Sequence, residues 1–392
     1  MDIGPIWRAM LKNKAGFVLI AVQIAVTMTI MVNAFAIMQE RANVAGRPSG
    51  MDEANTFAFA SATYADYDSD AMKSLIDEDL AIIRGLPGVK SAVATNALPM
   101  QQYGRSMLLQ TVPGNQTADS IESGIYFVDE HGIDTFASTI IDGKNFTPNQ
   151  VTWQIEDDDT WPAYGIITEV LGRDLFPDEQ GSYVGKSFYI NDNDPVNVIG
   201  VVKRLQSPWG GWSGVERSML VPQRRYSEFQ RYVVRAEQGF RDALMPNIEE
   251  LLSNSNKDRI IRDMTTMDRV RELAYFDDGA LIKMLSFIVG LLIIITGLGI
   301  VGLASFNVSR RMRQIGIRRA LGATKPAIVR YFMIENFIAN SIGLVIGGIL
   351  SVALNIAMVQ AFALEPLAWY VIPIAMVALL AVGQIAVAGP AK

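Results

Sequence analysis

The chain has 392 residues, half of them hydrophobic, with a formal net charge of −6, one histidine and no cysteine. Without cysteine there is neither a disulfide framework nor a thiolate metal site. The lone histidine, His131, cannot build a structural zinc site by itself. We therefore expect His131 to be a surface loop residue, and no metal or catalytic residues are predicted in this chain.

Four segments are long and apolar enough to cross a hydrocarbon layer of roughly 30 Å, which requires about 20 helical residues. None of them contains Lys, Arg, Asp or Glu. Each can satisfy its backbone hydrogen bonds internally as a helix, which lipid requires. The sequence therefore predicts four transmembrane helices, at residues 15–38, 284–304, 338–359 and 369–388.

The first segment allows two interpretations. Basic residues precede it, and Ala34-Phe35-Ala36 resembles the small-residue site of a cleavable secretory signal. Its apolar run of about 20 residues is, however, longer than the usual core of such a signal. We favour an uncleaved membrane anchor.

Positive charge orients the four helices, because Lys and Arg near membrane segments stay on the cytoplasmic side. Arg8, Lys12 and Lys14 precede the first segment, and seven Lys or Arg with no acid lie between Arg310 and Arg330. Lys392 follows the last segment. The predicted layout is a cytoplasmic N-terminus at 1–14, an extracytoplasmic domain with a helical stalk at 39–283, a cytoplasmic loop at 305–337, a short outer loop at 360–368 and a cytoplasmic tail at 389–392.

The predicted outer domain is acidic. From Glu40 to Ala280 the chain has 22 Lys and Arg against 37 Asp and Glu, a net charge of −15. A nucleic-acid-binding domain needs a basic face. Binding to nucleic acid is therefore excluded as a function of this domain.

Helix and strand patterns mix within the outer domain. Ser69–Gly85 has the apolar periodicity of an amphipathic helix, Leu86-Pro87-Gly88-Val89 ends it, and Ser91–Thr95 follows as a strand. Met245–Ser253 is predicted as a second helix with Pro246 in its first turn, where a missing amide costs little. An α+β fold is expected. Further strands are predicted at 164–168, 187–190 and 196–202, separated by turns at 156–159, 191–195 and 207–214.

Two further segments of the outer domain carry functional hypotheses. Asp263–Ala280 is predicted as a polar helix that runs into the second span, and Glu40–Asn43 as a continuation of the first. Together they would form a stalk that transmits motion. Ser207–Trp212 places two tryptophans among glycines, which fits either a loop packed on the core or a contact surface for a partner or substrate.

Two apparent ligand sites are rejected. Gly181–Ser187 resembles a phosphate-binding loop, but its spacing is one residue short and Lys186-Ser187 enters a predicted strand instead of a helix. Asp157-Asp158-Asp159 lacks the spaced oxygen ligands of a calcium loop and is expected to be solvated. The chain is therefore not expected to hydrolyse ATP by itself.

The basic cytoplasmic loop has the pattern of a folded element. Thr324 can cap a helix that begins at Lys325-Pro326, with the proline in the first turn. Gly316 and Gly322 are predicted to shape the turns that bracket a short basic helix before it. Positive-inside charge explains the Lys and Arg, but not the Gly, Ala and Thr positions. We therefore favour a docking surface.

The same loop resembles the signature of MacB/FtsX-type ABC transporter permeases. The likeness covers Gln314–Thr324, followed by Ile328, Phe332 and Glu335, and the opening Trp7–Lys14 is similar to the family's cytoplasmic start. Two departures are that Gln314 stands where the family usually has Glu, and that the family often continues with a short basic tail beyond Lys392. Shorter pieces of the outer domain also resemble the family's periplasmic core, at 86–89, 143–146, 175–176, 184–186 and 198–202.

The resemblance implies a four-helix permease whose outer domain is inserted between helices 1 and 2. Such permeases work as a homodimer or a related heterodimer, beside two separate ABC ATPase subunits that bind ATP and Mg, so this chain needs no cofactor itself. Membrane lipid, a periplasmic adaptor and an outer-membrane channel complete the expected partners. The implied ATPase-coupling residues are Gln314, Ile315, Gly316, Arg318, Arg319, Leu321, Gly322, Ala323, Thr324, Lys325 and Ile328.

The implied function is mechanical. ATP hydrolysis in the partner would move the periplasmic domain and drive efflux from the periplasm, with the protein in the cell inner membrane. Release of lipoproteins, or regulation of a cell-envelope enzyme or sensor without transport, are the alternatives. Glycines that would let helices approach closely in a dimer are Gly290, Gly297, Gly299 and Gly302, with Gly343 and Gly347 as a GxxxG pair.

Overall fold

The structure is a computed structural model that describes residues 14–114, 120–154, 161–190, 194–362 and 366–390. It divides into two compact units, one of Met1–Asn43 with Asp277–Lys392 and one of Val44–Phe276. We call the first the helical unit and the second the outer domain. Sequence predictions that lie outside the described residues are those for Arg8 and Lys12, for Glu156–Asp159, for residues 191–193 of the 191–195 turn, and for Lys392.

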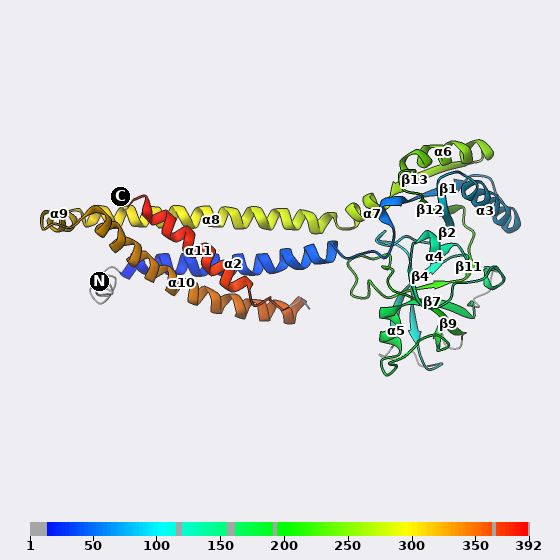
Figure 1. Ribbon diagram of the computed structural model, residues 1–392, viewed down its shortest axis with the longest axis horizontal. Coiled ribbons are helices and arrows are strands. Elements are labelled where there is room, and N and C mark those ends of the chain that lie inside the picture. The colour runs from blue at the N-terminus through cyan, green and yellow to red at the C-terminus, as the bar shows by residue number, and fades with distance from the viewer. Residues whose placement is uncertain (1–13, 115–119, 155–160, 191–193, 363–365, 391–392) are drawn as a thin grey trace. The chain divides into compact units, whose positions relative to one another are not determined.

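The helical unit contains four helices that are long and apolar enough to cross a membrane (Figure 1). Large apolar side chains such as Phe287, Leu298 and Ile349 are exposed on their outer faces, as helices surrounded by lipid require. The predicted four-helix membrane fold is thus confirmed. The described helices of this unit are α2 (Lys14–Ala45), α8 (Phe276–Arg310), α9 (Met312–Ala320), α10 (Lys325–Phe362) and α11 (Val371–Ala388).

Glycines of α10 bring it close to α2. A Cβ atom at Gly343 would lie 2.6 Å from the carbonyl oxygen of Ala21, and one at Gly347 would lie 2.7 Å from the Cβ of Met28. Small residues allow this approach between membrane helices. The resemblance implied that this pair lets helices approach closely in a dimer; the structure shows a close approach to α2 within the same chain.

Polar side chains also join the membrane helices. The hydroxyls of Thr27 in α2 and Thr296 in α8 lie 2.8 Å apart and are buried. The side-chain amide of Asn336 in α10 donates to the carbonyl of Gly383 in α11, at 2.9 Å. Such hydrogen bonds between helices stabilise contacts in lipid modestly and fix the register of the packed helices.

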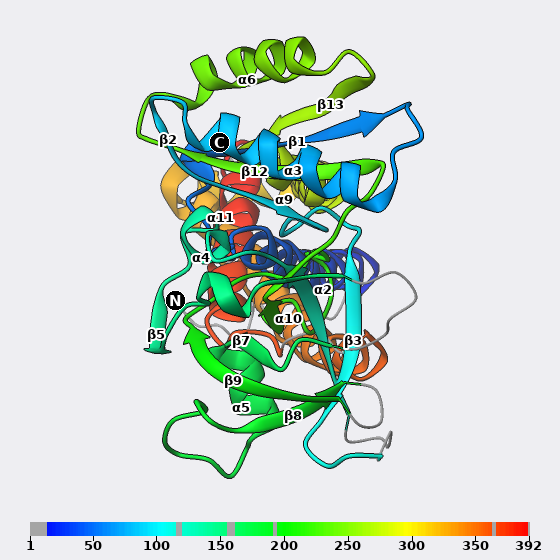
Figure 2. The same cartoon turned by 90° about the vertical axis from the view of Figure 1, so that its right-hand side faces the viewer.

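The outer domain is built on two sheets (Figure 2). The first, sheet A, is antiparallel in the order β13-β1-β12-β2, and α3 and α6 cover one of its faces through a shared apolar cluster. The elements are β1 (Thr56–Thr63), β2 (Val89–Thr95), β12 (Phe229–Ala236), β13 (Arg259–Thr266), α3 (Ser69–Arg84) and α6 (Arg241–Ser255).

The second, sheet B, is mixed and has the order β5-β9-β7-β10-β4-β3-β8. Because β8 pairs with both β3 and β9, six of these strands close into a ring around a separate apolar cluster. Its strands are β3 (Arg105–Gln110), β4 (Ile121–Phe127), β5 (Ile140–Gly143), β7 (Tyr164–Thr168), β8 (Ser187–Ile190), β9 (Asp194–Val202) and β10 (Ser218–Val221).

A third cluster lies between the two sheets and joins them into one domain. It includes Val233 of sheet A and Tyr126 of sheet B, whose buried hydroxyl donates to the carbonyl of Gln206 at 2.6 Å. The remaining elements are α4 (Gly132–Thr135), α5 (Glu169–Leu175), α7 (Met267–Ala274), β6 (Thr152–Trp153), β11 (Gln223–Arg224) and the 3-10 helices η1 (Glu53–Asn55) and η2 (Pro148–Gln150).

Several local predictions are confirmed. The amphipathic helix is α3, capped by Asp68, whose carboxylate accepts from the amide of Ala71 at 2.8 Å. Gly88 has φ of +88°, which suits the turn that the Pro-Gly pair predicted before β2. The strands predicted at 164–168 and 187–190 are β7 and β8, and 196–202 lies within β9.

The helix predicted over Asp263–Ala280 is confirmed from Met267 onwards, as α7 and the start of α8, but it is wrong for Asp263–Thr266. Its start is the end of β13, whose pairing with β1 supplies non-local hydrogen bonds that outweigh local helix propensity. Thr266 then caps α7, which ends at Ala274, and Tyr275 separates it from α8. A second error concerns α6, which begins at Arg241 and therefore carries Pro246 inside the helix instead of in its first turn.

The tryptophan loop packs on the core of the outer domain. Ser207, Pro208 and Gly210 are buried, and the rings of Trp209 and Trp212 meet edge to face at 6.1 Å. A Cβ at Gly210 would lie 2.9 Å from the hydroxyl of Tyr275. The structure therefore favours the packed loop over a free contact surface.

Candidate coupling site

The basic loop folds into a short helix between two long ones. After α8 ends at Arg310, α9 follows, and the chain turns at Gly322 into α10. Gly322 has φ of +101°, a conformation that glycine adopts without strain. The carbonyl of Thr324 accepts from the amides of Ala327 and Ile328 and so starts the α10 ladder.

The predicted turn at Gly316 is wrong, because Gly316 lies inside α9. The amide of Ile315, next to it, already donates to the carbonyl of Arg311 in a helical bond. Open space surrounds the position where its Cβ would stand. Gly316 therefore neither forms a turn nor permits a close contact within the described residues.

An ion pair ties the start of this loop to α10. The guanidinium of Arg311 donates to both carboxylate oxygens of Glu335, at 2.9 and 3.1 Å. The two side chains are 17 and 16% exposed. Because a two-pronged contact fixes angle as well as distance, α9 is held in a defined position against α10.

Apolar side chains of the loop separate into two groups. Ile315 and Ile328, with Tyr331 beyond them, pack against the core of the helical unit. Ile317 and Leu321 face away and are 56 and 83% exposed. The outward pair is too exposed for a packing role within the chain, which is typical of an interaction surface.

Most of the remaining predicted coupling residues lie on the exposed side of the loop. Gln314, Arg319, Thr324 and Lys325 are exposed, whereas Ala323 is half-buried. The side chain of Arg318 is not described. The structure thus brings the predicted residues into one segment, and their role in coupling stays a prediction.

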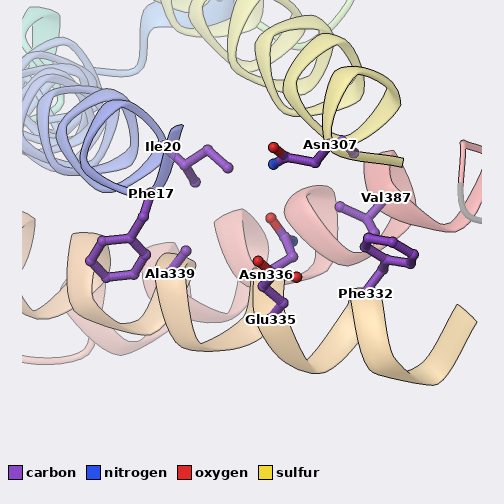
Figure 3. Close-up of a pocket in the computed structure, with 9 residues that line it drawn as sticks. Phe17, Ile20, Asn307, Phe332, Glu335, Asn336, Ala339 and Val387 are labelled. Atoms are coloured by element: carbon purple, nitrogen blue, oxygen red, sulfur yellow. The ribbon is translucent and has the colours of Figure 1, made fainter. Parts of the chain in front are cut away.

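Behind the ion pair lies a small cavity of about 40 Å³, lined mostly by apolar side chains together with Asn307, Glu335 and Asn336. Figure 3 shows Asn307 and Asn336 directed toward the same space, which α2 and α11 also border. The side-chain oxygen of Asn336 is buried and has no partner among the described residues. The cavity is large enough for one or two waters, which would satisfy this group.

The sequence analysis did not assign a role to this cavity or to the Arg311–Glu335 pair. The sequence gives one indication that Glu335 is paired, because this acid lies three residues before the predicted span at 338–359. An ionisable residue at such a depth needs a partner. Its partner Arg311, however, stands among seven similar cations in the sequence.

The segment Gly181–Ser187, which resembles a phosphate-binding loop, makes hydrogen bonds and an ion pair around sheet B. The amide of Gly185 donates to the carbonyl of Val198 at 2.8 Å, and Lys186 pairs with Glu179 at 2.5 Å. Ser187 begins β8, as predicted. A phosphate loop needs free amides at a helix start, so this segment is not one.

Within the described residues, the chain combines four helices long and apolar enough to cross a membrane, a large domain between the first and second of them in sequence, and a short basic helix between α8 and α10. Residues 286–392 match the family described as FtsX-like permease C-terminal. The resemblance to MacB/FtsX-type ABC transporter permeases is thereby confirmed.

Curated relatives agree with this assignment. The chain is 25% identical over 287 residues to the uncharacterized ABC transporter permease YknZ of Bacillus subtilis (strain 168), covering 71% of this chain and 65% of YknZ. It is 26% identical over 226 residues to the macrolide export ATP-binding/permease protein MacB of Shewanella oneidensis, covering 53% of this chain and 33% of MacB. The chain thus spans less than two thirds of the length of these relatives.

Solved structures with some likeness come from the same group. One is the extracellular domain of YknZ from Gram-positive bacteria, with a TM-score of 0.33, 20% identity, and coverage of 53% of this chain and 100% of that one. Another is the periplasmic region of MacB from Actinobacillus actinomycetemcomitans, with a TM-score of 0.36, 18% identity, and coverage of 59% and 97%.

Proposed function

We propose that this chain is the membrane subunit of an ABC transporter, and that it couples ATP hydrolysis by a separate cytoplasmic ATPase to movement of its outer domain. The direction we propose is efflux, from the outer side of the cytoplasmic membrane. ATP and Mg are bound by the ATPase, and a second permease chain completes the assembly.

One observation carries this proposal. Leu321 and Ile317 are exposed beside cationic residues, on a helix that Arg311 and Glu335 fix to α10. An exposed apolar pair on a rigid support is suited to a protein interface, because the surface loses little entropy on binding. A loop that served only as positive-inside charge would need no such support.

The proposal requires a defined sidedness, which can be tested by labelling. Ser69 of α3 lies in the outer domain. Ser309 of α8 lies next to the basic loop. With single cysteines in whole cells, an impermeant thiol reagent should label Ser69→Cys and spare Ser309→Cys until the membrane is opened. The reverse pattern would overturn the topology.

Contact with the ATPase can be tested by crosslinking in native membranes. A photoreactive amino acid at Leu321 should crosslink to a protein that carries a true phosphate-binding loop, identified by mass spectrometry. The same group at Phe287, which is exposed near the start of the predicted span at 284–304 in α8, serves as the control and should react with lipid. Equal crosslinking of the ATPase from both positions would rule out a docking surface at Leu321.

A further inference from the structure

The outer domain contains a cavity that is unrelated to the coupling loop. It lies between sheets A and B, where β2, β4 and β12 supply its walls, and has a volume of about 390 Å³. Asn96 connects these walls, because its side chain donates to the carbonyl of Ile125 and accepts from the amide of Phe127. The cavity is therefore held open by a defined link between the sheets.

A buried cation lines this cavity. Arg231 stands in the middle of β12, and its neighbour Tyr232 faces the opposite cluster under α3 and α6. Arg231 is 5% exposed. Because side chains alternate along a strand, Arg231 faces the side of sheet A that the helices do not cover.

Arg231 has no carboxylate within ion-pair distance among the described residues. Burial lowers the pKa of its guanidinium to about 10, and the more distant charge of Asp263 offsets part of this effect. A buried cation without a close acid is unfavourable for folding. Of the three other arginines in sheet A, Arg235 and Arg259 have carboxylate partners and Arg262 is exposed.

Aromatic rings surround the cations of the cavity. The guanidinium of Arg231 lies 4.8 Å from the ring centre of Tyr103, and that of Arg225 lies 3.7 Å from the ring centre of Phe127. Tyr103 and Phe229 are also among the exposed large side chains of the domain. The cavity therefore offers apolar faces beside positive charge.

The charge of the cavity contrasts with that of its domain. None of the described lining residues is acidic, although the segment from Glu40 to Ala280 has a net charge of −15. We propose that this cavity binds an amphiphilic anion, whose carboxylate or phosphate group contacts Arg231 and whose apolar part lies against Tyr103 and Phe127. This site does not depend on the proposed coupling to an ATPase.

Binding can be measured by calorimetry on the full chain in a neutral detergent, with detergent alone as the blank. The probes are 2-naphthoate, an aromatic carboxylate, and hexyl phosphate, which resembles a lipid headgroup with a short tail. The neutral analogue 2-naphthylmethanol tests whether charge is required. At least one anion should bind, and the stronger of the two identifies the source of the ligand.

Two substitutions separate the site from the fold. Arg231→Met should weaken binding of the anion at least tenfold. It should also raise the melting temperature of the ligand-free protein, because a buried unpaired charge is removed. Arg262→Met removes an exposed charge from β13, which β1 separates from β12, and should leave binding unchanged. Tyr103→Leu, at a half-exposed position, should weaken binding of 2-naphthoate without loss of folding.

The proposal is overturned if neither anion binds, or if 2-naphthylmethanol binds as tightly as 2-naphthoate. Equal affinity of the parent chain and Arg231→Met would also overturn it. A packing role alone for Arg231 would give a different pair of results. Arg231→Met would then lower the melting temperature, and Tyr103→Leu would still bind the anion.

Discussion

Replacing Asp79 with alanine is expected to destabilise the outer domain by about 3–5 kcal/mol, the usual cost of breaking a buried ion pair. Asp79 lies in α3, and both of its carboxylate oxygens lie 2.6 Å from a nitrogen of Arg259 in β13. The two side chains are 1 and 0% exposed. The loss of the acid would therefore leave a cation buried without a partner.

Arg259 is held on every side by this arrangement. It also donates to the carbonyl of Leu252 and to the hydroxyl of Ser255, both in α6, while Tyr232 donates to Asp79. The network thus joins α3, α6 and sheet A. Hydrogen exchange at β12 and β13 in the full chain should accelerate by a hundredfold or more, since 1.4 kcal/mol corresponds to tenfold.

Two controls distinguish the buried pair from general loss of charge. Glu78→Ala removes the neighbouring exposed acid of α3 and should leave exchange nearly unchanged. The double variant Asp79→Leu with Arg259→Met removes both charges and should recover much of the protection. If Asp79→Ala exchanged like Glu78→Ala, the network would be irrelevant to stability.

The second large effect is expected at the coupling site. Burying a leucine side chain at an interface contributes about 1.5–3 kcal/mol, so Leu321→Ser should weaken ATPase binding by about 10- to 100-fold. Gly322→Val should act in the same direction, because a β-branched residue is strained at its φ of +101°. Thr324→Ala tests the side-chain cap that the sequence predicts at the start of α10, whose loss should cost about 0.5–2 kcal/mol locally.

The measurement is recovery of the complex, together with ATPase activity and transport, for each variant. Arg318→Lys serves as the matched control, since it keeps the charge of the loop. If only charge mattered, Leu321→Ser and Gly322→Val would match the parent chain in all three assays, and the docking hypothesis would fail.

Much of the membrane architecture could be predicted, because length and the absence of charge are read directly from the chain. The helix start predicted at Lys325-Pro326 is confirmed as the start of α10, and the continuation predicted at Glu40–Asn43 is part of α2, which ends at Ala45. The sequence did not predict that the helix beginning at Lys325 and the span at 338–359 are one unbroken helix. Polar residues at the end of an apolar helix carry no stop signal of their own.

Errors in the sequence analysis concentrate where distant parts of the chain meet. The end of β13, Asp263–Thr266, is predicted as helical because its pairing with β1, some 200 residues earlier, leaves no local trace. Gly343 and Gly347 showed that some helix approaches closely, but not that it is α2. The Arg231 cavity depends likewise on two sheets that only the fold brings together.

The unbroken length of α10 has a mechanical consequence. Its 38 residues correspond to a rod of about 57 Å, nearly twice the roughly 30 Å of the hydrocarbon layer. A tilt of about 5° around its midpoint would displace each end by roughly 2.5 Å. Because α10 is one continuous helix from Lys325 to Phe362, the proposed coupling predicts that a force applied beside Leu321 would move the opposite end of α10 sideways.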